Sequence, residues 1–270
     1  MKSSLRLGAI AGIEIGVHHT WLLAVGLITW SLATMLFPSY YPRWDARAYW
    51  LVGAVAALLL FVCVLLHELS HSLVARALGM PVAGITLFIF GGVSNIRGEA
   101  DEPGDEFWMA VVGPLTSLAL AGLAWLLALG LRHAGTPVVA VLNYLATVNF
   151  LLALFNLVPG FPLDGGRILR SLLWAVTGDL RKATRIAARI GQAIAALFIS
   201  GGVVLSFQAP LNGIWLVFIG WFLLSAAQAS TRQLTPSAIG YLQPPQAPLD
   251  GNLDPARQAP EDGTRPLGLP

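Results

Sequence analysis

Residues 50–72 read WLVGAVAALLLFVCVLLHELSHS, an uncharged apolar run that ends in two histidines and a glutamate. A helix crosses the roughly 30 Å of membrane hydrocarbon in about 20 residues, so this run is long enough to span a bilayer. Ionisable groups inside a membrane are energetically costly and are usually functional. The stretch therefore predicts a transmembrane helix with a functional site in its second half.

The composition extends this conclusion to the whole chain. Of its 270 residues, 56% are hydrophobic and only 11% are charged, whereas soluble domains carry about 25% charged residues. The net charge of +2 is too small to favour nucleic-acid binding, so no nucleic-acid partner is expected. The single cysteine, Cys63, excludes an intramolecular disulfide and a cysteine-rich metal site. We predict an integral membrane protein with several spans.

Hydropathy divides the chain into candidate spans and two other segments. The predicted fold is an all-α polytopic membrane protein with six spans, at about 20–37, 49–78, 107–131, 138–158, 187–207 and 212–229. Residues 82–98, VAGITLFIFGGVSNIRG, are rich in β-branched and aromatic residues around Gly91 and Gly92, which predicts a β-hairpin or sheet edge at the membrane surface. Residues 235–270 hold eight of the seventeen prolines and predict a flexible tail.

The basic residues predict the orientation. With the N-terminus in the cytoplasm, eleven lysines and arginines before the tail fall on the cytoplasmic side, and only Arg43, Arg47 and Arg132 fall outside. We therefore expect both termini in the cytoplasm. The expected location, a prokaryotic cell (inner) membrane, does not follow from the charges and is a separate expectation.

The histidines follow a metal-binding spacing. His67 and His71 are four residues apart, so both imidazoles lie on one helix face and can bind one cation. In the HExxH arrangement, two histidines and a third residue hold zinc and leave a position for water. The metal lowers the pKa of that water to about 7, and the glutamate, here Glu68, accepts its proton as hydroxide attacks a carbonyl. The alternative is that the histidines merely mark the end of a span, which the apolar context disfavours.

The third ligand is predicted from residues 155–167, FNLVPGFPLDGGR. Pro159, Gly160 and Pro162 interrupt the helix, and irregular backbone at membrane depth is tolerated only inside protein or beside water. The first charge after the break is Asp164, which can complete the site. Asp164 can also be interpreted as the cap of a short helix through ILRSLLW, but the incomplete HExxH site favours a ligand.

Other polar and small residues have two interpretations each. Asn156 can donate its amide to a substrate carbonyl or oxyanion, or it can satisfy carbonyls of the broken helix, and both remain open. Gly113 and Ser117, four residues apart, predict a small-residue face for close helix packing. The remaining histidines are interpreted as membrane-interface residues rather than ligands: His18, His19 and His133.

HELSH in one span and NLVPGFPLDGG at the end of another resemble the site-2 protease family of intramembrane zinc metalloproteases. The resemblance covers about residues 5–231 and includes GIEIGVHHTW and ITLFIFGGVSN. It implies an endopeptidase that hydrolyses peptide bonds in or near transmembrane segments during regulated intramembrane proteolysis. One Zn²⁺ per chain would be bound by His67, His71 and Asp164, with Glu68 as catalytic base.

The resemblance also implies a domain plan and substrate contacts. Residues 1–234 would form the metalloprotease domain, with a catalytic core at about 49–177, followed by the Pro-rich cytoplasmic tail at 235–270. A membrane-protein or transmembrane-peptide substrate would bind within the lipid bilayer, at Asn156, Gly91, Gly92 and Asn95. The pattern is most similar to the branch with C-terminal CBS domains, for which 235–270 is too short, so no nucleotide is expected.

A metal transporter or metal-sensing membrane protein is the alternative function. It would use the same histidine and aspartate ligands but would give Glu68 no role in bond cleavage. The glutamate beside the first histidine favours the enzyme.

Overall fold

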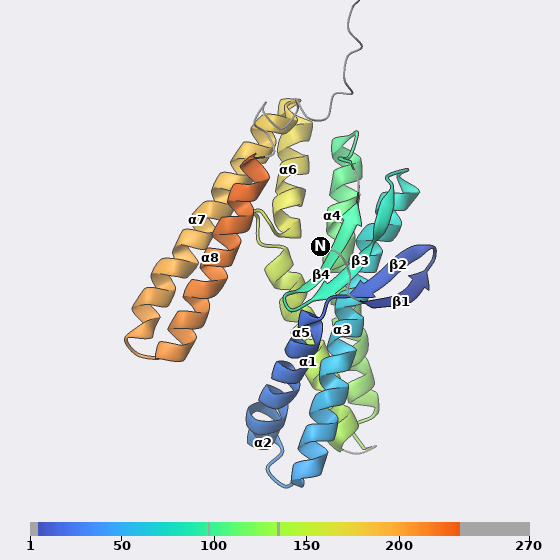
Figure 1. The fold of residues 1–270 in the computed structure, drawn as a ribbon, viewed down its shortest axis with the longest axis vertical. Coiled ribbons are helices and arrows are strands. Elements are labelled where there is room, and N and C mark those ends of the chain that lie inside the picture. The colour runs from blue at the N-terminus through green and yellow to red at the C-terminus, as the bar shows by residue number, and fades with distance from the viewer. Residues whose placement is uncertain (1–4, 97, 134–135, 233–270) are drawn as a thin grey trace, which may run out of the picture. The chain divides into compact units, whose positions relative to one another are not determined.

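The computed structural model describes residues 5–96, 98–133 and 136–232, so the predicted tail at 235–270 lies outside the described residues. Most of them are helical, and a small sheet lies beside the helices (Figure 1). The elements in chain order are β1 (Leu5–Ile10), β2 (Ile13–Val17), α1 (Thr20–Ser31), the π-helix η1 (Leu32–Leu36), α2 (Phe37–Tyr40), α3 (Ala46–Ala77), β3 (Val82–Phe88), β4 (Gly91–Ile96), α4 (Pro103–Gly130), α5 (Thr136–Asn156), α6 (Asp164–Thr177), α7 (Leu180–Ser206) and α8 (Pro210–Arg232).

Six helical segments among the described residues are long and apolar enough to cross a membrane, which confirms the predicted polytopic fold. They are Thr20–Tyr40, Ala46–Ala77, Pro103–Gly130, Pro137–Asn156, Leu180–Ser206 and Pro210–Ser230. The fifth begins at Leu180, earlier than the predicted residue 187, because its basic first turns are helical. Asp179 caps these turns by accepting a hydrogen bond from the Lys182 backbone N–H at 2.9 Å.

The helices pack through small residues and expose large apolar ones. Ala56, Ala57, Ala110, Ala153 and Ala187 are completely buried, which lets neighbouring backbones approach closely. Large leucine, phenylalanine and tryptophan side chains instead point away from the bundle. Small residues inside and large apolar residues outside are the reverse of the arrangement in a soluble protein, and they fit contact with lipid on the outer faces of the helices.

The sheet is larger than the sequence predicts. Its strand order is β1-β2-β3-β4, with antiparallel pairs at β1–β2 and β3–β4 and a parallel pair at β2–β3. The β3–β4 hairpin is the predicted one, whereas β1 and β2 were not predicted. Ile13 and Ile85 pack with Leu69 of α3, so the sheet lies against the half of α3 that carries the histidines.

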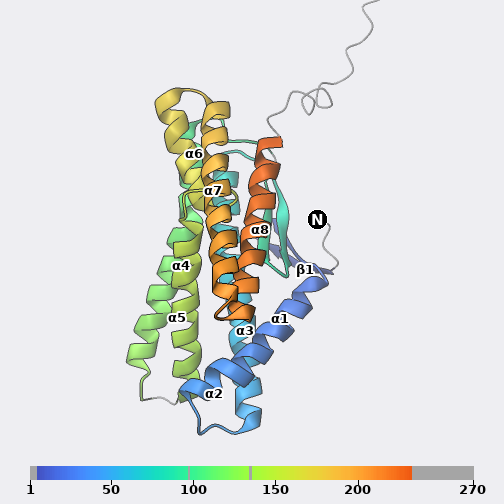
Figure 2. The same cartoon turned by 90° about the vertical axis from the view of Figure 1, so that its left-hand side faces the viewer.

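The contacts among the helices show how α3 and α6 are connected. α4 packs against both α3 and α5, and α7 and α8 run side by side as a hairpin (Figure 2). α6 packs mainly on α4 and α7 and makes little contact with α3. The two helices that carry the predicted metal ligands, α3 and α6, are therefore joined largely through α4.

Candidate metal centre

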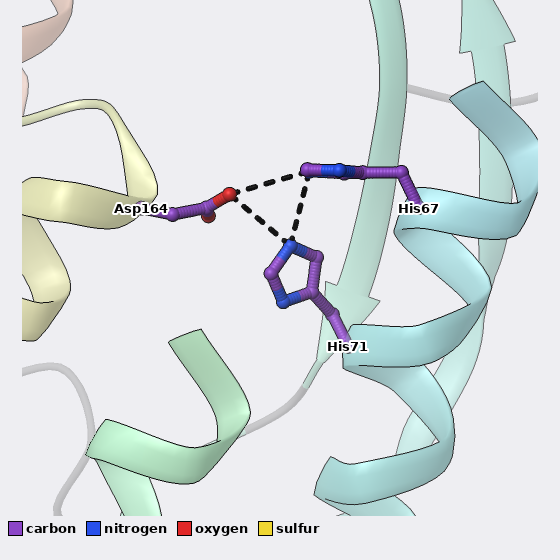
Figure 3. Close-up of side chains that lie close together, drawn as sticks. All are labelled: His67, His71 and Asp164. Carbon is purple, nitrogen blue, oxygen red and sulfur yellow. Dashed lines mark hydrogen bonds and ion pairs between the residues drawn. The ribbon is translucent and has the colours of Figure 1, made fainter. Parts of the chain in front are cut away.

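His67, His71 and Asp164 converge on one point (Figure 3). The two Nε2 atoms are 3.3 Å apart, and the Asp164 Oδ2 lies 3.2 Å from His67 Nε2 and 3.3 Å from His71 Nε2. The histidines come from successive turns of α3, where both are buried, and the aspartate is the first residue of α6. Residues nearly a hundred positions apart thus meet in a near-equilateral triangle of donor atoms.

The triangle fits a zinc ion. Tetrahedral zinc with bonds of about 2.0–2.1 Å separates its ligand atoms by roughly 3.3–3.4 Å, close to the separations here. Among the described residues, the buried Asp164 Oδ2 has no hydrogen-bond partner, and its nearest polar neighbours are the two imidazole Nε2 atoms. A buried carboxylate oxygen without a hydrogen-bond partner, at this spacing from two imidazoles, is suited to be the third metal ligand.

Asp164 does not cap a helix. The N-cap of α6 is Leu163, and no side chain makes a capping hydrogen bond there. The side chain of Asp164 instead points toward the imidazoles (Figure 3). The geometry therefore favours the ligand interpretation over the capping one.

Helix α4 orients both imidazoles from behind. His71 Nδ1 donates to the Met109 carbonyl at 2.6 Å, and His67 Nδ1 lies 2.9 Å from Ser117 Oγ. Because a carbonyl can only accept, His71 carries its proton on Nδ1, which leaves the Nε2 lone pair facing the centre. Such outer partners fix the tautomer and the ring orientation of metal-binding histidines.

Gly113 provides the space that the imidazoles occupy. A Cβ at this position would overlap the His71 ring and lie 2.9 Å from His67 Cε1. The small-residue face of Gly113 and Ser117 does lie where α3 and α4 pack, but it also holds the histidines. Sequence reasoning missed this second role, although the four-residue spacing of the pair matches that of His67 and His71.

Glu68 is held by strand β4. Its Oε2 accepts a hydrogen bond from Ser94 Oγ at 2.7 Å, and a Cβ on Gly92 would lie 2.5 Å from its Cγ. The strand therefore fixes where this carboxylate can lie. Ser94 was not predicted as a functional residue, since nothing in the sequence links it to α3.

A cavity of about 420 Å³ opens beside His67, Glu68 and Asp164. Aromatic side chains form part of its wall: the ring of Phe90, at the β3–β4 turn, lies 5.1 Å from that of Phe222 on α8. The other lining residues are Val64, Gly91, Gly92, Leu152, Phe155, Asn156, Pro162, Leu163, Trp215, Phe218, Ile219 and Leu223. The cavity is mostly apolar around a few polar groups, as expected of a binding site.

The predicted substrate-binding residues are placed differently from one another. Gly91, Gly92 and Asn156 line the cavity, whereas Asn95, further along β4, is not among its lining residues. Asn156 Nδ2 donates to the Leu152 carbonyl at 3.0 Å, so it satisfies a helix carbonyl while facing the cavity. Both interpretations of Asn156 therefore remain compatible with its position.

Glycines allow the broken segment between α5 and α6 to fold tightly. A Cβ on Gly165 would overlap the carbonyl oxygens of Leu157 and Val158, and one on Gly191 of α7 would overlap the Phe161 carbonyl oxygen. These close approaches require glycine. They hold the segment against α6 and α7 and so position Asp164.

Known proteins are similar to this chain in sequence. Rip3 from Mycobacterium tuberculosis, whose name describes it as a zinc metalloprotease, is 46% identical to this chain. The match covers 87% of this chain and 61% of Rip3. The protein sll0528 from Synechocystis, named in the same way, is 40% identical over 86% of this chain and 61% of its own. The chain thus spans about three fifths of the length of these relatives.

A solved structure and a family model agree with these relatives. The site-2 protease from Methanocaldococcus jannaschii superposes with a TM-score of 0.55 at 30% identity, covering 84% of this chain and 95% of that one. The model of peptidase family M50 matches residues 55–134 and 131–198, which include all three candidate metal ligands. The chain belongs to peptidase family M50.

Proposed function

We propose that this protein is a zinc-dependent endopeptidase that hydrolyses peptide bonds in or near transmembrane segments of membrane proteins. The observation that carries the proposal is the triangle of His67, His71 and Asp164 beside Glu68, with His67, Glu68 and Asp164 lining one mostly apolar cavity. Membership of peptidase family M50 supports the same reaction.

Each residue has a role that follows from its position. His67 and His71, through Nε2, and Asp164, through its carboxylate, would hold one Zn²⁺. A bound zinc ion lowers the pKa of water to about 7 and polarises a peptide carbonyl. Glu68, oriented by the Ser94 hydroxyl, accepts the proton of the attacking water and returns it to the leaving amine.

Strand β4 offers a place for an extended substrate. It is an edge strand of the sheet, and Gly91 and Gly92 bring its backbone to the cavity. A substrate helix must unwind before its carbonyl can be attacked, and an unwound strand can pair with an edge strand by β-augmentation. Asn156, the last residue of α5, also lines the cavity and can donate its second amide N–H to the carbonyl under attack.

We also propose the cellular setting that these features fit. The protein would act in regulated intramembrane proteolysis in a prokaryotic cell membrane, with both termini in the cytoplasm. The concentration of lysine and arginine on one side of the six spans supports this orientation.

Reconstitution into liposomes tests the function. Purified protein is mixed with transmembrane peptides of known sequence, and the products are identified by mass spectrometry. We expect cleavage within or beside the apolar segment, loss of cleavage with a chelator, and recovery with zinc. Zinc flux across the liposome membrane with no cleavage of any peptide would instead support the metal-transporter alternative.

A further inference from the structure

A buried ion-pair cluster connects α4 and α6 close to the candidate metal centre. Glu106 in the first turn of α4 is completely buried, and its Oε1 accepts hydrogen bonds from Nε and Nη2 of Arg170 on α6, the first at 2.7 Å. Arg167, one turn before Arg170, has its Nε 3.7 Å from the same oxygen. Two arginines of α6 thus converge on one carboxylate of α4.

Glu106 lies on the same face of α4 as the residues that hold the histidines. The positions of Glu106, Met109, Gly113 and Ser117 are three, four and four residues apart, so they form one helix face. All four are buried. Met109 and Ser117 contact the Nδ1 atoms of the histidines, and Gly113 gives both rings their space. One face of α4 therefore contacts the ligands of α3 and, one turn away, the helix that carries Asp164.

The arginines of α6 also hold the segment that leads into Asp164. The guanidinium carbon of Arg170 lies 5.4 Å from the centre of the Phe161 ring, three residues before Asp164. Arg167 Nη2 is 3.9 Å from the Met109 sulfur, on the residue whose carbonyl accepts from His71. Because α6 makes little contact with α3, these contacts with α4 contribute to the distance between Asp164 and the imidazoles, together with the glycine contacts of the preceding segment.

We propose that Glu106 is a positioning residue for the metal: through Arg170 and Arg167 it fixes α6 on α4 and so places Asp164 at coordination distance from His67 and His71. The inference rests on the proposed zinc site. A buried carboxylate and two arginines are a costly way to join two helices, since apolar side chains would pack them at lower cost. An ion pair, unlike apolar packing, has a defined geometry, and a metal ligand needs one.

The test is zinc affinity of the purified full chain, measured by competition with a chelator, together with the absorption spectrum of bound Co²⁺. Glu106→Gln keeps the shape of the side chain but removes the buried counter-charge of Arg170, which is buried, and of Arg167, which is partly exposed. We expect zinc affinity to fall about 10- to 100-fold, as is usual when an outer partner of a metal site is lost. We also expect a changed Co²⁺ spectrum, because the oxygen ligand moves while the two imidazoles stay.

Glu99→Gln is the matched control. The Glu99 carboxylate is also near Arg170, with Oε1 3.8 Å from Nη1, but its side chain is 64% exposed. Because an exposed ion pair contributes little, we expect its loss to change zinc affinity by no more than about twofold. If Glu106→Gln and Glu99→Gln changed zinc affinity to the same extent, the buried Glu106 carboxylate would have no special role.

The outcome separates this inference from the proposed site. Asp164→Asn must weaken zinc binding if the site is correct, and its failure to do so would overturn both proposals. If Asp164→Asn weakens binding while folded Glu106→Gln keeps wild-type affinity and the wild-type Co²⁺ spectrum, only the inference is wrong. If Glu106→Gln fails to fold, Arg170→Lys is used in its place, because lysine retains the positive charge but not the guanidinium geometry. We expect the zinc affinity of Arg170→Lys to fall several-fold. An unchanged affinity would overturn the inference.

Discussion

Gly113 of α4 lies so close to His71 of α3 that a side chain at position 113 would overlap the imidazole. The absence of a side chain there is what allows both histidines to turn their Nε2 atoms toward Asp164. Helix α4 contributes no candidate ligand, yet it determines where the ligands of α3 lie. This relationship leads to the first test.

Gly113→Ala should displace His71 and weaken zinc binding by about 100-fold or more, since an outer-partner loss alone costs 10- to 100-fold. Chelator competition measures the effect. Gly122→Ala, in the same helix, is the control because a Cβ there would meet nothing within 4 Å. It should keep wild-type zinc affinity. Wild-type affinity in Gly113→Ala would show that the imidazoles do not depend on this space.

Ser117→Ala should lower zinc affinity about 10- to 100-fold, because the His67 imidazole loses the partner of its Nδ1. The neighbouring hydroxyl provides a matched control: Thr116 Oγ1 donates to the Val112 carbonyl of its own helix and does not contact the site. Thr116→Ala should therefore bind zinc as the wild type does. Similar affinities in the two variants would contradict an orienting role of Ser117.

Asp164→Asn should abolish zinc binding at concentrations that saturate the wild type, because the site loses its only carboxylate ligand and two imidazoles alone hold zinc weakly. Asp179→Asn is the control for the same substitution at an aspartate that only caps a helix, since Asp179 caps α7. It should lower the free energy of unfolding by at most about 1 kcal/mol and leave zinc content unchanged. Zinc content by mass spectrometry and thermal unfolding separate the two effects.

Ser94→Ala should reduce the rate of peptide cleavage while zinc content stays at one ion per chain. The charged Glu68 carboxylate loses a hydrogen bond of 2.7 Å, and the loss of such a bond corresponds to a cleavage rate that is roughly 10- to 100-fold lower. Ser225→Ala is the control, because this exposed hydroxyl donates to the Trp221 carbonyl within α8. A Ser94→Ala protein that loses zinc would show that the strand supports the metal rather than the base.

The sequence predicts the spans, and it predicts candidate metal ligands that the structure brings together, because both depend on local patterns. Apolar runs of sufficient length set the six spans, and the four-residue spacing places His67 and His71 on one face. Asp164 could be predicted because Pro159, Gly160 and Pro162 end a helix just before the first available charge.

Features that depend on tertiary contacts could not be predicted in the same way. Strand β2 joins the sheet by pairing in parallel with β3, and the whole of α3 separates the two strands in the sequence. In addition, the short segment before the first span carries no clear strand pattern. Ser94 and Glu106 look like ordinary polar residues in the sequence. Their roles follow only from the packing of β4 on α3 and of α6 on α4.

The central claim is that Glu68 takes part in bond cleavage rather than in metal binding, and Glu68→Gln tests it most directly. The substitution keeps the size of the side chain but removes its negative charge and its ability to accept a proton. We predict that the purified variant retains one zinc ion per chain and that its cleavage rate falls at least about 10²-fold in the same liposome assay. A zinc-loaded Glu68→Gln protein that cleaves the peptide at the wild-type rate would contradict the account.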